Sequence, residues 1–238
     1  MITISLCMIV KDEENVLERC LSSVARLVDE IIIVDTGSTD KTKQIAGKFT
    51  DKIFDFQWID DFSAARNFAF DKAVMDYILW LDADDIIMQS DQEKFMALKK
   101  ELTFETDVVM MHYNIGFDES ERVTFSYFRE RLVKRSNKFK WFEPVHECLQ
   151  FGGNIIHADI GITHAKPEEN INDRNLKIYE RLLADGKELS ARGTYYYARE
   201  LKDHKRYEDA ILMFTKFLDS GSGWVEDNIV ACSELADC

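Results

Sequence analysis

The order of hydrophobic and polar positions divides the first hundred residues into alternating strands and helices. Four short runs rich in large apolar residues predict strands, over 2–10, 30–35, 52–56 and 77–81. The segments between and after them carry apolar residues at helical spacing and predict helices, over 15–27, 41–49, 63–75 and 90–102. Strands and helices that alternate with short connections favour an α/β fold with a mostly parallel, doubly wound sheet.

The pattern changes twice further along the chain. From about residue 107 strand-like segments dominate, over 107–115, 122–128, 130–134, 148–151 and 155–162. From Glu168 the chain is charged and helical, and residues 193–214 look like one tetratricopeptide (TPR) helical pair, a unit that normally stacks on neighbours. We therefore expect an α/β domain over 1–166 and a short helical, TPR-like region over 167–238, truncated from a longer architecture.

Three carboxylates follow the apolar run Tyr77–Leu81 within four residues, in the sequence Asp82-Ala83-Asp84-Asp85. So apolar a run is typical of a strand inside a parallel sheet, and open α/β sheets bind ligands at the carboxyl ends of such strands. Carboxylates this close resist ionising together unless a cation neutralises them. One Asp alone would favour a turn or a helix cap, but the whole cluster favours a divalent-metal site.

Composition narrows the classes of partner and compartment. The chain of 238 residues is 46% hydrophobic and has a net charge of −14, so no broad basic surface for nucleic acid is expected. The five cysteines show no metal-binding spacing, which favours a reduced, cytoplasmic protein. The amino terminus is typical of a first strand rather than a signal peptide. No apolar stretch approaches the roughly 20 residues of a transmembrane helix, so any membrane attachment is expected to be peripheral.

Four segments together resemble the family 2 glycosyltransferases, which have a GT-A fold. They are Ser5–Glu14, Asp29–Asp40, Ala65-Arg66-Asn67 and Leu81–Asp85, in the order and spacing of that family across residues 1 to about 164. The subgroup with helical repeats behind the catalytic domain, which includes bacterial protein and peptide glycosyltransferases, looks most similar. The resemblance implies a metal-dependent, inverting enzyme that uses a nucleotide-diphosphate sugar, and we expect a UDP-sugar.

The resemblance also assigns residues to the donor site. It implies that Asp84 reaches Mn²⁺ or Mg²⁺, which prefer hard oxygen ligands, and that Asp82 lies nearer the ribose. A cation there would neutralise the charge on the departing diphosphate. Asp35 would hydrogen-bond the nucleotide base, and the backbone of Met8 and Val10 would frame it. An Asx-turn at Asp35 is compatible with that role.

Other charged residues allow two interpretations each. Glu14 is expected near the base, yet it equally suits the first turn of a helix. Arg66 would face the donor, where a guanidinium suits base, ribose or phosphate oxygens, and a solvated helix-face Arg is the alternative. His164 would add to the metal shell, although a lone His after a strand is more often simply hydrogen-bonded. Arg129 and Arg131 alternate along a strand and would approach phosphate or acceptor, or form surface ion pairs.

An inverting transfer needs a base that removes the proton of the acceptor. In the resembling family this carboxylate comes well after the Asp-X-Asp motif, and here Glu147 fits that place. His146 beside it would orient an acceptor or a phosphate, and Glu143 is the reserve candidate for the base. A loop with an exposed acid is the alternative reading. Trp141, although aromatic residues are mostly core, is the best candidate for stacking on a sugar ring.

The sequence leaves more than one functional hypothesis. The first is the glycosyltransferase, acting on a protein, peptide or glycan acceptor, with a helical tail that presents the acceptor or forms a homodimer. The alternative is a catalytically degenerate GT-A domain that serves as a TPR-type peptide-binding scaffold. A nucleotidyltransferase would normally show a Gly- and Arg-rich phosphate loop near the first strand, and residues 10–14 offer none.

Overall fold

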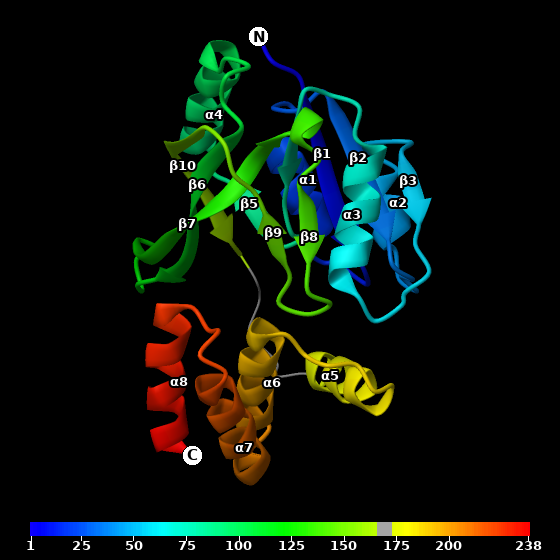
Figure 1. Ribbon diagram of the computed structural model, residues 1–238. Helices are drawn as coiled ribbons and strands as arrows, with labels where there is room; N and C mark the ends of the chain where they lie inside the picture. Colours follow the sequence, from blue (N-terminus) through cyan, green and yellow to red (C-terminus); the bar gives the residue numbers. More distant parts are fainter. Residues whose placement is uncertain (166–172) are drawn as a thin grey trace. The chain divides into compact units, whose positions relative to one another are not determined.

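The computed structural model describes residues 1–165 and 173–238 (Figure 1). The described residues divide into two compact units. The first contains residues 1–59, 63–142 and the stretch from Leu149 to the undescribed segment. The second contains the carboxyl-terminal helices together with two short loops, 60–62 and 143–148.

The first unit is built on an eight-stranded sheet in the order β3-β2-β1-β4-β7-β6-β10-β5. Its strands are β1 (Ile4–Val10), β2 (Glu30–Asp35), β3 (Ile53–Asp55), β4 (Tyr77–Trp80), β5 (Asp85–Ile87), β6 (Val108–Phe117), β7 (Val123–Lys134) and β10 (Ile155–His164). Strands β1 to β4 are mutually parallel, as are β6 and β10. Strand β7 is antiparallel to β4 and β6, and β5 is antiparallel to β10. This sheet confirms the predicted α/β class.

Helices cover both faces of the sheet, because both faces of its central strands are apolar. The helices are α1 (Leu17–Val24), α2 (Thr42–Ala46), α3 (Phe62–Lys72) and α4 (Gln89–Glu101). Leu17 and Leu21 of α1 and Phe95 of α4 share one core cluster with alternate residues of β1 and β4. Ala69 and Phe70 of α3 belong to a second cluster on the opposite face. A two-stranded sheet of β8 (Lys140–Phe142) and β9 (Cys148–Gln150) completes the strands.

The described residues of the second unit form four helices: α5 (Arg174–Ala184), α6 (Ala191–Asp203), α7 (Tyr207–Asp219) and α8 (Val225–Asp237). Its core is aromatic, with the ring of Tyr195 packed against Phe217 at 5.2 Å and Phe214 at 6.3 Å between centroids. The pair α6 and α7 forms over the segment in which the sequence predicts a helical pair. Among the described residues, no helix is long and apolar enough to span a bilayer.

Two expectations about the strands need correction. The segments 122–128 and 130–134 are one continuous strand, β7, whose pairing with β6 shifts register between Val109 and Met110. Strand β5 begins at Asp85, inside the carboxylate motif, where no strand was expected. Both features shape the site described next.

Candidate active site at the carboxyl edge of the sheet

The carboxylate motif lies where β4 ends and β5 begins. A tight turn, closed by the N–H of Asp85 donating to the carbonyl of Asp82 at 3.1 Å, reverses the chain after the buried strand. Strand β5 then pairs with β10, and this ladder sets His164 directly opposite Asp85. The N–H of Ala165 donates to the carbonyl of Asp84 at 2.9 Å and fixes the same register. Residues 79 positions apart in the chain thus meet at one edge of the sheet.

Asp84, Asp85 and His164 form a group that could hold a metal ion. One potential ligand atom from each lies within 4.8 Å of the others. The Nδ1 atom of His164 is 3.5 Å from an oxygen of Asp84 and 3.6 Å from Oδ1 of Asp85. The predicted ligands Asp84 and His164 are therefore brought together, and Asp85 is a third candidate that sequence analysis did not single out.

A buried ion pair holds Asp85 in place. Its Oδ2 accepts a hydrogen bond from Arg131 at 2.9 Å and another from the N–H of Asp82 at 3.0 Å. Both side chains are fully buried. The other oxygen, Oδ1, is buried without a hydrogen-bond partner among the described residues and belongs to the group with His164. A buried carboxylate oxygen left unpaired is costly, so this arrangement suits a hard divalent cation.

His164 carries a proton in the absence of a metal. The carboxylates of Asp84 and Asp85, 3.5 and 3.6 Å from its Nδ1, raise the pKa of His164 to about 10, against the opposing effect of burial. The hydroxyl of Tyr113, on β6, forms a hydrogen bond of 2.9 Å with Nδ1. Because a His ligand must be neutral, a cation at this site would displace that proton.

Asp82 is paired with a cation from the preceding helix. The guanidinium of Arg66 donates to Oδ1 of Asp82 at 2.7 Å and lies against two indole rings, 5.1 Å from the centroid of Trp80 and 4.9 Å from that of Trp141. Burial would raise the pKa of Asp82, but the charges of Arg66 and Arg131 lower it to about 2. Arg66 is therefore not a solvated helix-face residue, and it holds Asp82 ionised.

The aromatic residues behind Arg66 are structural. Trp141 is only 2% exposed and packs edge-on against Trp80 at 4.9 Å between ring centroids. Its backbone forms two hydrogen bonds of 2.9 Å with the side chain of Asn67, the neighbour of Arg66. A ring this buried offers no face to a sugar, so the expectation that Trp141 stacks on one is wrong for this structure.

The predicted base-binding residues lie at the carboxyl ends of β1 and β2. Met8 and Val10 are buried in β1, and Val10 is in register with Asp35. Oδ2 of Asp35 accepts hydrogen bonds from the N–H groups of Gly37 and Ser38, at 3.1 and 3.0 Å, which is an Asx-turn. Its Oδ1 is buried and unpartnered among the described residues. Asp35 therefore uses one carboxylate oxygen for the Asx-turn, and its other oxygen has no hydrogen-bond partner among the described residues.

Glu14 lies in the turn before α1 rather than in the helix. Its carboxylate accepts a hydrogen bond of 3.1 Å from the N–H of Lys41, at the start of α2. This contact joins the two loops that follow β1 and β2. The helix-dipole explanation for Glu14 is thus replaced by a loop-bridging contact.

The segment proposed to carry the base belongs to the second unit. His146 stacks on Tyr196 at 4.2 Å, and its Nε2 is 3.0 Å from a carboxylate oxygen of Glu200. Glu143 accepts a hydrogen bond of 2.7 Å from Ser190. Helix α6 thus fixes the loop that carries Glu147, and the catalytic role of Glu147 and His146 stays a prediction.

Arg131 is the residue whose surroundings differ most from those that the sequence predicts. Arg129 and Arg131 alternate in sequence, which predicts one shared face, and both do lie over the ring of Trp80, although they differ in burial and in ion-pair partner. Arg131 is fully buried, 4.0 Å from the Trp80 ring centroid and 4.4 Å from that of Tyr113. Arg129 lies over the same indole at 5.0 Å and pairs with Glu130 at 3.4 Å. A surface ion pair is excluded for Arg131.

Comparisons with known proteins agree with this architecture. Residues 5–155 match the family model described as glycosyl transferase family 2. A TPR repeat-containing protein of Synechococcus elongatus is 38% identical over 150 residues, covering 63% of this chain and 36% of that protein. The SPbeta prophage-derived glycosyltransferase SunS of Bacillus subtilis is 28% identical over 232 residues, covering 92% of this chain and 54% of that protein. The chain thus spans between about a third and just over half of these relatives.

Solved structures share the fold at low sequence identity. TarS of S. aureus, in complex with UDP-GlcNAc, superposes with a TM-score of 0.55 and 17% identity, covering 91% of this chain and 80% of that one. Glucosyl-3-phosphoglycerate synthase of Mycobacterium tuberculosis, in complex with Mn²⁺ and UDP-glucose, gives a TM-score of 0.54 and 17% identity, covering 80% and 81%.

Proposed function

The chain belongs to glycosyl transferase family 2, and we propose that it transfers a sugar from a nucleotide-diphosphate donor, specifically a UDP-sugar, to a nucleophile on an acceptor. The solved structures that share its fold hold UDP-GlcNAc or UDP-glucose. In this proposal Asp35 accepts a hydrogen bond from the base through its open oxygen, and Met8 and Val10 frame that base. Arg66 keeps Asp82 ionised beside the ribose.

The observation that carries the proposal is the group formed by Asp84, Asp85 and His164. These three residues would hold Mn²⁺ or Mg²⁺, and the buried, unpaired Oδ1 of Asp85 fits that use. A bound divalent cation supplies positive charge to the leaving diphosphate. Arg131 then has a supporting role, because its hydrogen bond of 2.9 Å holds the carboxylate of Asp85 in place.

The remaining features of the reaction rest on the loop 143–148. We propose an inverting transfer in which Glu147 removes the proton of the attacking acceptor group. His146 is engaged with Glu200 and Tyr196, so it contributes by fixing the loop. The acceptor is a protein, peptide or glycan.

Nucleotide binding gives the direct test. With UDP and Mn²⁺ at about 100 times their dissociation constant, binding should add about 2.7 kcal/mol to the free energy of unfolding. Differential scanning fluorimetry should show a rise in Tm that is lost on chelation and in Asp84→Ala. Asp51→Ala, at an exposed position outside the motif, is a matched control that should keep the response. A rise that survives both chelation and Asp84→Ala would contradict the metal site.

The base is tested separately. Glu147→Gln should bind UDP and Mn²⁺ as the wild type does, while the rate of sugar release from a UDP-sugar falls by about 10²–10⁴-fold. Glu143→Gln lies in the same loop and should retain most of the rate. Full activity of Glu147→Gln would remove that residue from the mechanism and leave donor binding untouched.

A peptide-binding role for the helical unit is a second candidate. Helices α7 and α8 expose several large apolar side chains: Leu212 at 61%, Trp224 at 71% and Ile229 at 66%. Exposed apolar groups of this size often mark interaction sites. A TPR-type scaffold would bind peptides without any response to UDP or to chelation, so the thermal measurements above separate the two functions.

A further inference from the structure

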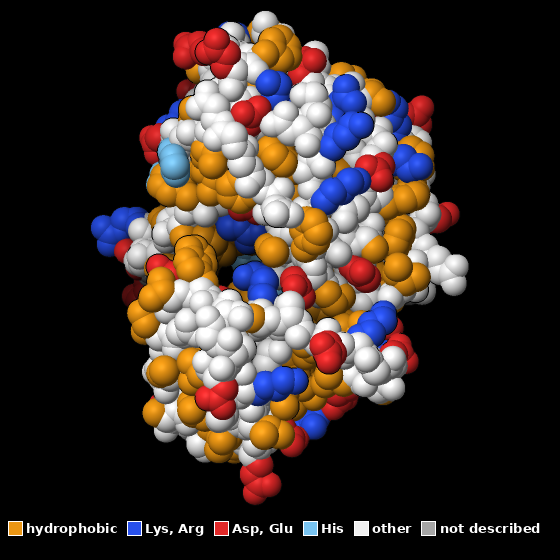
Figure 2. Space-filling model, in the orientation of Figure 1, with side chains coloured by type: hydrophobic (Ala, Val, Ile, Leu, Met, Phe, Trp, Pro, Cys, Tyr) orange, Lys and Arg blue, Asp and Glu red, His pale blue; other side chains and the backbone are white. Residues whose placement is uncertain are grey.

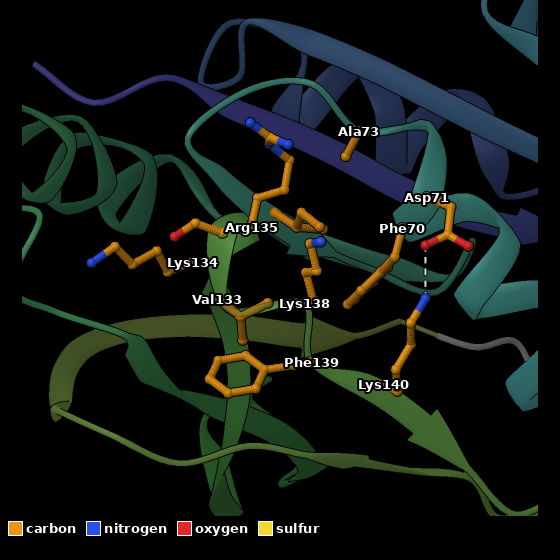
Figure 3. A pocket seen from close by; sticks show the side chains of 11 residues that line it. Phe70, Asp71, Ala73, Val133, Lys134, Arg135, Lys138, Phe139 and Lys140 are labelled. Carbon is orange, nitrogen blue, oxygen red and sulfur yellow. Dashed lines mark hydrogen bonds and ion pairs between the residues drawn. The ribbon is translucent and has the colours of Figure 1, made fainter.

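A pocket of about 300 Å³ opens on the edge of the sheet opposite the carboxylate cluster (Figure 3). It lies between the end of α3, the start of β4, the end of β7 and the short 3₁₀ helix η1 (Arg135–Asn137) that leads into β8. Its volume is at the lower end of the range of small-molecule sites. None of the residues assigned above to the donor site lines it.

The wall of the pocket is apolar. Phe70, Ile78, Val133 and Phe139 contribute side chains to it. Phe70 and Val133 also belong to the core cluster on that face of the sheet, so the wall is backed by packed residues. Such a surface favours an apolar portion of a ligand.

The rim of the pocket is mainly cationic, with Asp71 as the one acidic residue among those that line it. The segment Lys134-Arg135-Ser136-Asn137-Lys138-Phe139-Lys140 has four basic residues and no acidic one, in a chain whose net charge is −14. In Figure 2, Lys and Arg side chains gather over the region of η1 and α3. Positive side chains gathered in one short segment would attract an anion at short range, even though the chain as a whole is acidic.

Two of the four basic side chains, Arg135 and Lys138, have hydrogen-bond donors that no described residue uses. Nε of Arg135 donates to the carbonyl of Met75 at 2.5 Å, which fixes the guanidinium while its terminal nitrogens form no hydrogen bond with described residues. The ammonium of Lys138 likewise has no partner in the described part of the chain, and its backbone is left-handed, with φ of 53°. Lys140 pairs with Asp71 at 2.7 Å, and Lys134 donates to the carbonyl of Phe104. In the view of Figure 3, Phe70 lies between Lys138 and the Lys140–Asp71 pair.

We propose that this pocket binds a phosphate monoester attached to an apolar group. The fixed guanidinium of Arg135 matches two oxygens of a phosphate, and the ammonium of Lys138 supplies a further charge. The apolar wall takes up the group to which the phosphate is attached. This ligand site is independent of the proposed glycosyl transfer, because the two use opposite edges of the sheet.

The test uses 1-naphthyl phosphate as the probe, with 1-naphthol and inorganic phosphate for comparison. Titration calorimetry should show binding of the phosphorylated probe that exceeds both comparison compounds by at least about tenfold. The double variant Arg135→Ala/Lys138→Ala should weaken it by about tenfold or more. Arg26→Ala/Lys100→Ala removes the same two charges from exposed positions elsewhere and should bind as the wild type does.

A second arm identifies the source of the ligand. Vesicles that contain phosphatidic acid present the same phosphate monoester on a lipid. Binding of the soluble probe alone would indicate a soluble ligand, and loss of vesicle binding in Arg135→Ala/Lys138→Ala would indicate a lipid headgroup; either supports the site. Equal binding by the two double variants, or no binding of either probe, would overturn the proposal. The UDP response should be unchanged in Arg135→Ala/Lys138→Ala, which separates this test from that of the donor site.

Discussion

Arg131 and Asp85 face each other inside the protein with no exposed surface on either side chain. Taking two charges out of water is costly, and their mutual attraction offsets that cost only while both are present. The Nε and a terminal nitrogen of Arg131 also lack hydrogen-bond partners among the described residues. The indole of Trp80 and the phenol of Tyr113 partly compensate, since cations are attracted to aromatic faces.

Removing one partner of this ion pair should therefore lower the free energy of unfolding more than removing both partners does. We expect Arg131→Met to lower the free energy of unfolding by about 3–5 kcal/mol, because it leaves Asp85 charged and unpaired. The double variant Arg131→Met/Asp85→Asn should recover part of that loss. Urea denaturation of the four proteins in the cycle measures the coupling. Additive losses would show that the pair does not act as a unit.

At the residue scale, the sequence indicated the carboxylates better than their partners. An apolar strand that runs into Asp82-Ala83-Asp84-Asp85 is a local signal, visible within nine residues. The pairing of Asp85 with Arg131 depends on a register shift in β7, and the burial of Trp141 depends on α3. Neither long-range contact leaves a trace in the hydrophobic pattern around those residues.

At the scale of secondary-structure elements, the connection between β9 and β10 has little conformational freedom in its backbone. Gly153 lies between β9 and β10 with φ of 93°, a conformation that residues with a Cβ rarely adopt. A Cβ built there would lie 2.3 Å from Oδ2 of Asp107. That oxygen accepts a hydrogen bond of 2.8 Å from the N–H of Asn154 at the start of β10. The glycine and the carboxylate together fix the entry into the strand that carries His164.

Substitution of Gly153 should lower the free energy of unfolding. We expect Gly153→Ala to destabilise the protein by about 1–3 kcal/mol, from backbone strain and displacement of Asp107. Its neighbour Gly152 has no atom within 4 Å of a built Cβ and no positive φ, so Gly152→Ala should change the free energy of unfolding much less. Chemical denaturation compares the two variants. Equal effects would argue against a special role for Gly153.

Helix α6 holds the loop that contains Glu147 through Glu200. Burial would raise the pKa of Glu200, but hydrogen bonds from His146 and Asn175 lower it below its usual range. A carboxyl with a lowered pKa stabilises the folded state above its unfolded-state pKa, and this contribution is lost as the pH falls through the folded-state pKa.

Stability measurements as a function of pH check this contact. Glu200→Gln should be less stable than the wild type at neutral pH by about 1 kcal/mol, and the gap should close as the pH falls below about 4. Thermal unfolding at a series of pH values measures it. Glu208→Gln, at the exposed start of α7, should show no such gap. A difference between Glu200→Gln and the wild type that is constant with pH would exclude the ionic contribution.

Periodicity predicted most elements of the sheet but missed the one that closes the site. Strand β2 spans Glu30–Asp35 as predicted, because the four consecutive β-branched apolar residues Ile31–Val34 give an unambiguous strand pattern. Strand β5 has three residues and begins with a charged one, so its pattern resembles a loop. It is a strand because β10 provides its hydrogen-bond partners, and β10 is more than 60 residues away in sequence.

The whole molecule is acidic, with a net charge of −14 and a pI of about 4.8. This charge raises the local concentration of cations and disfavours anions until they bring a cation with them. The proposed donor carries a diphosphate, so the overall field favours its binding together with the metal.

This field gives a salt dependence that can be measured. The affinity for Mn²⁺ should fall several-fold as the ionic strength rises from about 20 to about 200 mM, because screening weakens the attraction. Calorimetric titration with Mn²⁺ at fixed pH gives the dissociation constant. Asp84→Ala should remove the strong site at every ionic strength. An affinity that does not change with salt would show that only local contacts determine metal binding.

The division of the chain into two compact units depends on contacts between residues that are far apart in sequence. The sequence predicts a boundary at residue 166, which lies outside the residues that the structure describes. The structure also groups loops 60–62 and 143–148 with the helices, through the pairing of Asp60 with Arg181 and the Glu143–Ser190 contact. These contacts join residues far apart in sequence, and composition does not reveal them.

The position of β10 between β6 and β5 has a consequence for biosynthesis. On the ribosome, the amino-terminal strands and the motif at 82–85 emerge long before His164. Until then β6 has an open edge, which is the kind of surface on which nascent chains aggregate. Insertion of this late strand both covers the edge of β6 and brings His164 opposite Asp85. The proposed metal-binding group and the protected edge of β6 should therefore appear in the same step of synthesis.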